Sequence, residues 1–243
     1  MFERGTELEQ LRRRIHSRRS FLLHGPAGVG KTLLITHVLG DFPQALYCPA
    51  SSSSQAIFRE LAGALARAGN PVAVRSLGRD AAKLKTKSAV AVKGIVSDAL
   101  QGGGHSIILD HCAFTSQALA AAVREVAGWT STPVVAVARS AHMEDAGFIR
   151  SMFPERSARM ELKNFSPDGA VRFAHEVARR QQLAAENLSQ FMERVAELSG
   201  GNPGSIVSMI EMARQPRYRS AENIKITPLY VDFRIKWNAT THA

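Results

Sequence analysis

The sequence predicts an α/β fold, an αβα sandwich with a parallel sheet between two layers of helices, followed by a small C-terminal helical domain. Short apolar runs alternate with segments of helical periodicity over residues 1–162, which is typical of a parallel sheet covered by helices. The run at residues 133–138 is apolar at nearly every position and indicates a strand buried on both faces. After residue 162 the pattern becomes purely helical as far as residue 213.

Each expected strand is a short apolar run bounded by turn residues. The first helix has Thr6 as its cap. Further helices are expected at residues 31–39, 55–68, 89–100 and 116–127, and strands at residues 20–24, 45–48, 106–110, 133–138 and 160–162. The pattern at residues 72–88 assigns no element.

The second domain begins where Ser166 precedes Pro167, the order of an N-cap and the first residue of a helix. About three helices follow. We therefore expect a core over residues 1–162, a helical lid over residues 163–215 and a C-terminal tail over residues 216–243.

The tail carries a pattern of its own. Val231, Phe233, Ile235 and Trp237 alternate with polar residues, which is the period-two signal of a strand. Such a strand would pair with the chain's own sheet, or it would add to the sheet of a neighbouring subunit or a protein partner.

The formal net charge is +10 and the sequence pI is near 10.2. Such a balance favours polyanions, either nucleic acid or an acidic membrane surface, or it is a solvated surface that aids solubility. No apolar run approaches the roughly 18 residues of a membrane span, and charges stand where a signal peptide needs an apolar stretch. We expect a cytoplasmic protein without a membrane partner. The two cysteines have no metal-binding spacing.

One motif matches in full: Gly25–Thr32 reads GPAGVGKT, the pattern GxxxxGK[ST], and lies between an expected strand and an expected helix. In such a P-loop, backbone N–H groups surround phosphate oxygens and the helix N-terminus adds partial positive charge. The motif predicts ATP binding with Mg²⁺, Lys31 on the β- and γ-phosphates and Thr32 on the metal. The expected binding residues are Gly25, Pro26, Ala27, Gly28, Val29, Gly30, Lys31 and Thr32.

Asp110 ends the apolar run SIILD, so its carboxylate should emerge at the sheet edge beside the P-loop and hold Mg²⁺ together with Thr32. His111 stands where many nucleotide-hydrolysing proteins carry a second acid. A neutral imidazole can orient a water, and a protonated one cannot act as a base. Alternatively, His111 merely occupies the position. We expect firm ATP binding with slow or partner-dependent hydrolysis.

Over roughly residues 2–213 the chain resembles the AAA+ superfamily, in particular its origin-recognition-like and STAND-type branch. The segment Phe2–Leu11 resembles the family's entry box, with Glu3 in place of the usual glycine. Asp110 matches the Walker B acid, and His111 departs from the usual catalytic glutamate.

The resemblance also implies roles for three arginines and one proline. Arg139, after an expected strand, corresponds to sensor 1 and would sense the γ-phosphate. Arg156 and Arg159 are candidates for an arginine finger that reaches a neighbouring subunit, or they are surface charges. Pro203 lies in a Gly-Asn-Pro turn that contacts nucleotide in the family; the usual sensor 2 arginine is not evident.

Three functions compete for such a chain. The first is an ATPase that forms a homo-oligomer in the ATP state and associates with duplex DNA, as transposition-regulator ATPases do. Lys83, Lys85 and Lys87 would then lie on one side of an extended segment that follows a phosphate backbone, and Arg12–Arg19 is a second basic stretch. The alternatives are a STAND-like signalling or scaffold NTPase without DNA binding, and an adaptor that binds ATP without hydrolysing it.

Overall fold

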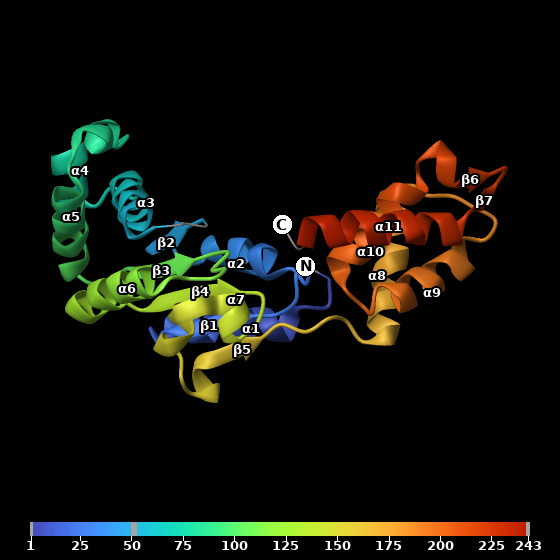
Figure 1. Ribbon diagram of the computed structural model, residues 1–243, viewed down its shortest axis with the longest axis horizontal. Helices are drawn as coiled ribbons and strands as arrows, with labels where there is room; N and C mark the ends of the chain where they lie inside the picture. Colours follow the sequence, from blue (N-terminus) through green and yellow to red (C-terminus); the bar gives the residue numbers. More distant parts are fainter. Residues whose placement is uncertain (1, 50–52, 242–243) are drawn as a thin grey trace. The chain divides into compact units, whose positions relative to one another are not determined.

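The computed structural model describes residues 2–49 and 53–241, which form two compact units (Figure 1). The first unit consists of the described residues of Thr6–Gly25 and Lys31–Glu161. The second consists of the described residues of Met1–Gly5, Pro26–Gly30 and Leu162–Ala243. The middle of the P-loop therefore packs with the C-terminal helices, although it interrupts the first unit in the sequence.

A five-stranded parallel sheet forms the centre of the first unit, which confirms the predicted fold class. Its strand order is β2-β3-β4-β1-β5, and every pairing is parallel. The strands are β1 (Phe21–His24), β2 (Ala45–Cys48), β3 (Ser106–Leu109), β4 (Val134–Ala138) and β5 (Arg159–Glu161). All five coincide with the predicted apolar runs to within one or two residues.

Both faces of the sheet are buried, as the unalternated strands predicted. Leu22, Leu109 and Ala136 share one hydrophobic core with the helices α3 (Ser54–Arg67), α5 (Ala89–Gln101) and α6 (Gln117–Thr130). Their chain neighbours on the opposite face, which include Leu23 and Val135, are equally buried, because successive side chains of a strand point to opposite faces.

Helical segments precede or connect the strands of this unit. α3, α4 and α5 pack against one another beside β2 (Figure 1). Side chains cap several of them: Ser53, Asn70, Ser88 and Ser116 accept hydrogen bonds from backbone amides of the first turn. The helices are α1 (Gly5–His16), α2 (Lys31–Leu39), α3 (Ser54–Arg67), α4 (Pro71–Leu77), α5 (Ala89–Gln101), α6 (Gln117–Thr130) and α7 (Met143–Ala146), with 3₁₀ turns η1 (Ala82–Thr86), η2 (Gly147–Met152) and η3 (Arg156–Ala158).

The second unit is helical with one small hairpin. Ser166 caps the first helix and Pro167 begins it, as predicted. Phe191, Met209 and Ile210 are fully buried in the core of this unit. Its elements are α8 (Pro167–Arg180), α9 (Leu188–Leu198), α10 (Pro203–Ala213), η4 (Pro216–Tyr218), β6 (Arg219–Ser220), β7 (Asn223–Ile224) and α11 (Ile226–Thr241). Among the described helices of both units, none has the length and apolar character needed to cross a bilayer.

The expected strand in the tail is wrong, because this segment forms α11. Leu229, Phe233 and Trp237 are spaced by four residues, and they pack on the core of the second unit, which is the stripe a helix presents. Val231 and Ile235 are left 51% and 67% exposed. Burying this stripe of three side chains against α9 and α10 therefore outweighs the local alternation that predicted a strand.

Candidate nucleotide site

The strand order brings three predicted site segments to one edge of the sheet. β1, β4 and β3 are neighbours, and parallel strands end at the same edge, where ligands of such sheets bind. Gly25 follows β1, Arg139 follows β4 and Asp110 follows β3. The amide of Gly25 donates a hydrogen bond of 3.2 Å to the carbonyl of Arg139, so the start of the P-loop is tied to the strand beside it.

The P-loop requires glycine at two of its positions. Gly28 and Gly30 have φ angles of 76° and 99°, in a region that residues with a Cβ rarely adopt. Inside the loop, the amide of Val29 donates 3.3 Å to the carbonyl of Pro26. The ammonium group of Lys31 donates 2.7 Å to the carbonyl of Gly25. Burial of this ammonium group lowers the pKa of Lys31 to about 8. An anionic ligand beside it would compensate for the lost solvation of the charged group.

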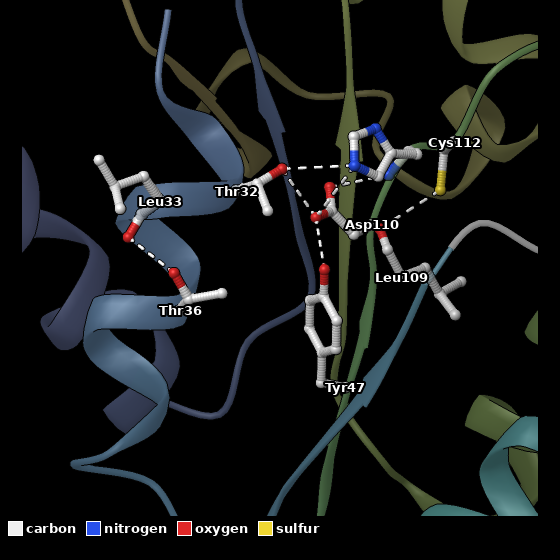
Figure 2. Close-up of polar contacts among 8 residues, drawn as sticks. Thr32, Leu33, Thr36, Tyr47, Leu109, Asp110 and Cys112 are labelled. Carbon is white, nitrogen blue, oxygen red and sulfur yellow. Dashed lines mark hydrogen bonds and ion pairs between the residues drawn. The ribbon is translucent and has the colours of Figure 1, made fainter.

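Thr32 and Asp110, the predicted metal ligands, are in direct contact (Figure 2). Thr32 Oγ1 donates to Asp110 Oδ2 at 2.8 Å. The Asp110 side chain has no exposed surface, and two further donors hold it: the Tyr47 hydroxyl, 2.8 Å from Oδ2, and the His111 amide, 2.8 Å from Oδ1. Hydroxyl and carboxylate oxygens are the ligands that Mg²⁺ prefers, so this donor set fits the expected metal.

Tyr47 belongs to this site although the sequence did not point to it. The residue lies on β2 in register with Ile108 of β3, two residues before Asp110, so the two strands bring the phenol to the carboxylate (Figure 2). Burial, together with the bond to Asp110, raises the pKa of Tyr47 to about 12. The phenol is therefore a permanent donor. In the sequence, Tyr47 is a tyrosine within an apolar run. That pattern does not reveal the hydrogen-bond partner of its hydroxyl until the pairing of β2 with β3 is known.

His111 lies beside Thr32 and Asp110. Its imidazole Nε2 is 3.5 Å from Thr32 Oγ1 and 3.6 Å from Asp110 Oδ2, and its side chain is 63% exposed. Its backbone has a φ of 53°, and its amide donates to Asp110 Oδ1. The backbone of His111 therefore orients the carboxylate whatever the imidazole does.

The three predicted arginines differ in their surroundings. Arg139 is exposed after β4, and its positive charge contributes to the lowered pKa of Lys31. The guanidinium of Arg159 donates to the carbonyls of Phe153 and Pro154, at 2.9 Å each. Arg156 is exposed on the short turn η3. Arg159 thus holds its own loop together, and Arg156 is the exposed candidate of the two.

The predicted extended segment with three lysines is wrong. Residues 82–86 form the 3₁₀ turn η1, which Asp80 starts by accepting a bond from the amide of Ala82 at 3.2 Å. A 3₁₀ helix has three residues per turn, so Lys83 and Lys85 point in different directions. Both are exposed, and Lys87 ends the turn half-buried.

The second basic stretch is largely engaged in structure. Arg12 pairs with Asp41 at 2.8 Å. Arg14 donates to the carbonyls of Ser157 and Arg159 at 2.8 and 3.2 Å. Arg18 donates to the carbonyls of Gly104 and His105 at 2.9 and 3.3 Å. These arginines fasten α1 and the turn after it to the rest of the first unit.

Pro203 begins α10, between two residues that contact the P-loop within the second unit. The side-chain amide of Asn202 donates 2.8 Å to the carbonyl of Ala27, and the amide of Gly204 donates 2.9 Å to the carbonyl of Gly28. Within this turn the sequence pointed to Pro203 and not to Asn202. Arg4 was expected only as part of the entry segment, whereas its guanidinium reaches the carbonyl of Val29 at 3.4 Å.

Comparison with known proteins assigns the chain to a family. The profile of the AAA ATPase domain matches residues 1–200, so the chain belongs to this family, and the predicted resemblance is confirmed. α10 and α11 lie in the part of the chain that the profile does not match. The family as a whole uses ATP and Mg²⁺. No curated protein matches the sequence.

Several solved structures share the fold at low sequence identity. The Walker-type ATPase PABY2304 of Pyrococcus abyssi is 14% identical with a TM-score of 0.70, and the match covers 99% of this chain and 74% of that one. Cdc6p of Pyrobaculum aerophilum is 14% identical with a TM-score of 0.55, with 87% and 61% covered. The STAND protein PH0952 of Pyrococcus horikoshii, which has a tetratricopeptide repeat sensor, is 14% identical with a TM-score of 0.54, with 97% and 32% covered.

Proposed function

We propose that this chain is a Mg²⁺-dependent ATPase that binds ATP firmly, assembles into a homo-oligomer in the ATP state and associates with duplex DNA, and that it hydrolyses ATP slowly or when a partner stimulates it. The observation that carries the nucleotide part is the bond between Thr32 and Asp110 at the end of a complete P-loop. Lys31 would hold the phosphates, and Thr32 and Asp110 would hold the metal, which would neutralise phosphate charge when bound.

Slow hydrolysis is proposed because of His111. An efficient ATPase needs a group that orients or deprotonates the attacking water. The imidazole lies within reach of the metal ligands. A neutral imidazole orients water less strongly than a carboxylate that stays ionised at neutral pH.

Nucleotide binding is tested by calorimetry with ATP, in the presence of Mg²⁺ and of a chelator, on the wild type and on Lys31→Ala. We expect binding by the wild type that weakens when the metal is chelated, and a loss of roughly tenfold or more in Lys31→Ala. Wild-type protein that binds no ATP in either condition refutes the proposal.

Assembly is tested through the two arginines after η2. A trans-acting finger must be exposed, which favours Arg156 over the engaged Arg159. We expect Arg156→Ala to retain ATP binding and thermal stability while losing the increase of ATPase rate with protein concentration. Arg159→Ala should instead lower the melting temperature. A protein that remains monomeric with ATP at all concentrations, as measured by light scattering, excludes the oligomer.

The DNA part of the proposal rests on the net charge of +10 and on the three lysines of η1 and its end, of which Lys83 and Lys85 are exposed and Lys87 is half-buried. Replacing Lys83, Lys85 and Lys87 by alanine should weaken binding to duplex DNA and reduce the log–log salt slope by about 0.9 for each phosphate that the variant no longer neutralises. The matched control removes three exposed cations of the second unit, Arg194, Arg214 and Lys225. Equal effects of both variants would contradict the site, and no binding with or without ATP would contradict the DNA role.

A second candidate function is an adaptor that binds ATP without hydrolysing it, and it is favoured by the histidine at position 111. Single-turnover measurements with radiolabelled ATP separate the two. Nucleotide recovered intact after long incubation, with DNA and at high protein concentration, supports the adaptor.

A further inference from the structure

Five consecutive carbonyls of the P-loop accept hydrogen bonds, each from within its own unit. Those of Gly25 and Pro26 are used inside the motif, by Lys31 Nζ at 2.7 Å and by the Val29 amide at 3.3 Å. The next three are used by residues far away in the sequence. Ala27 accepts from Asn202 at 2.8 Å, Gly28 from Gly204 at 2.9 Å and Val29 from Arg4 at 3.4 Å.

In the two peptide groups whose carbonyls Asn202 and Arg4 hold, the amides are left without protein partners. In a trans peptide the C=O of one residue and the N–H of the next point in opposite directions. The bond from Asn202 to the Ala27 carbonyl therefore turns the Gly28 amide away from Asn202, and the bond from Arg4 turns the Gly30 amide away from Arg4. Within the described part of the chain, neither amide has a hydrogen-bond partner. Such donors are ready for an anion.

Asn202 is itself held in one orientation. Its Oδ1 accepts from the amide of Ser205 at 3.1 Å, which caps α10, so its Nδ2 is left to donate. This Nδ2 donates to Ala27 at 2.8 Å and to Asn164 Oδ1 at 3.2 Å. Asn164 in turn donates to the carbonyl of Gly200 at 3.0 Å. With only 6% of Asn202 exposed, these bonds hold its side chain in this orientation.

The side chain of Arg4 is likewise held by contacts within the second unit. Its guanidinium lies over the Phe165 ring at 4.4 Å and donates 2.8 Å to the carbonyl of Lys163. Packing also restricts the loop: a Cβ at Gly28 would lie 2.7 Å from Asn202 Oδ1 and 2.9 Å from Trp237. The loop is thus held from one side by the N-terminal segment, the start of α10 and α11.

We propose that Asn202, supported by Arg4, is a positioning residue for nucleotide binding: it holds the outer carbonyls of the P-loop so that the Gly28 and Gly30 amides face the phosphates. This inference rests on the proposed nucleotide binding and deepens it. The turn Gly201-Asn202-Pro203 then orients the P-loop and is not itself a direct ligand of the nucleotide. Without the Nδ2 donor, the Ala27–Gly28 peptide can rotate, and the amide would face the phosphate only part of the time.

Two substitutions remove the donor and retain the helix cap. Asn202→Asp keeps an oxygen for the Ser205 amide but cannot donate to Ala27. Asn202→Ser also caps, is uncharged, and is too short to bond both partners. The matched control is Asn70→Ser, because Asn70 caps α4 with Oδ1 and donates to the Ala99 carbonyl at 3.0 Å in the same manner, within the other unit. If only Asn202→Asp had an effect, repulsion by its charge would be the cause and the inference would fail.

The first readout is hydrogen exchange of the amides of residues 28–31 at saturating Mg²⁺-ATP, measured by mass spectrometry, because the Gly28 and Gly30 amides would gain a partner only when the phosphates bind. We expect faster exchange in both Asn202 variants and wild-type exchange in Asn70→Ser. The second readout is ATP affinity, which should fall roughly three- to tenfold in both Asn202 variants, the range that one hydrogen bond supplies.

The outcomes are separable. Unchanged exchange in Asn202→Ser overturns the inference, and so does faster exchange with wild-type ATP affinity. Wild-type protein that binds no ATP refutes the proposed function itself. The melting temperatures of Asn202→Ser and Asn70→Ser could also fall equally while exchange at residues 28–31 stays as in the wild type. Asn202 would then act only as a helix cap, and the inference would be overturned.

Discussion

The hydroxyl of Thr32 donates a hydrogen bond to the carboxylate of Asp110 across 2.8 Å. The two residues are far apart in the sequence, one at the start of α2 and the other after β3, and their contact defines the metal end of the candidate site. Thr32→Val removes the hydroxyl and keeps the shape. We expect ATP binding to lose its dependence on Mg²⁺ and any hydrolysis to fall roughly 10–100-fold.

The control for this variant lies one turn further along the same helix. The hydroxyl of Thr36 donates to the carbonyl of Leu33, at 3.1 Å (Figure 2), and the residue is exposed. Thr36→Val should bind ATP with unchanged Mg²⁺ dependence in the same titration. Equal behaviour of the two valine variants would remove Thr32 from the metal site.

Tyr47→Phe should destabilise the fold slightly and weaken the metal site. The substitution removes one of the donors to a carboxylate without exposed surface, at a cost of about 1 kcal/mol, or roughly 2–4 °C in melting temperature for a chain of this size. Tyr230→Phe is the control, since the Tyr230 hydroxyl accepts a bond from the exposed Arg234 at 3.1 Å. Calorimetric scans with and without Mg²⁺-ATP measure both effects. A Tyr47→Phe protein with wild-type melting in both conditions would mean that this phenol is dispensable.

His111 can be tested in both directions. His111→Ala should keep wild-type ATP affinity, because the bond to Asp110 Oδ1 comes from the backbone amide. His111→Glu should raise the basal hydrolysis rate roughly tenfold or more, since a carboxylate there can take the role of a general base. Phosphate release under steady-state conditions is the assay. Rapid hydrolysis by the unassisted wild type that His111→Ala leaves intact would show that this position does not limit the rate.

The helical nature of the tail predicts a large loss of stability for one apolar residue and almost none for its neighbour two positions on. Phe233 is 3% exposed and Ile235 is 67% exposed. Phe233→Ala should lower the free energy of unfolding by about 3–5 kcal/mol, and Ile235→Ala should change it by no more than about 0.5 kcal/mol. Urea unfolding followed by circular dichroism measures the difference. In a strand with both residues on one face, the two variants would behave alike.

The thiol of Cys48 provides a prediction about pH. Cys48 has no exposed surface, and its burial raises the pKa to about 12, against about 8.5 in an unfolded chain. Between these values the unfolded chain loses its proton and the folded one keeps it, so this group favours folding below about pH 8.5 and the contribution is lost as the pH rises toward 12. In a Cys112→Ser background, a thiol reagent at pH 9 should label Cys48 only after denaturant is added. Stoichiometric labelling of the folded protein within minutes would contradict its burial.

Local sequence signals sufficed for the sheet and for most of the site. The central strands β1, β3 and β4 were predictable because their runs are apolar without alternation, a pattern that few other arrangements tolerate. The P-loop was predictable because its glycines are needed by the backbone itself, as the φ angles of Gly28 and Gly30 show. Asp110 followed from these two, since the carboxyl ends of parallel strands meet at one edge.

The predicted secondary structure was wrong where the same residues fitted two local patterns or fitted none clearly. The segment around Phe233 alternates, as a strand does, and also repeats every four residues, as a helix does. The region of Lys83 and Lys85 carries no hydrophobic period strong enough to assign an element. Only burial against the rest of the chain decides such cases, because the hydrophobic free energy of a buried face exceeds the preferences of single residues.

The sequence by itself determined that this chain has a parallel sheet, a phosphate loop and an acid at the sheet edge beside it. The tertiary structure alone decided that Tyr47 donates to Asp110, that Arg159 is engaged by its own loop and that Asn202 holds the carbonyl of Ala27. The physical reason is the separation along the sequence between the residues that determine each feature. Backbone conformation and strand burial depend on neighbouring residues, whereas a hydrogen bond between residues 27 and 202 exists only after the whole chain between them has folded.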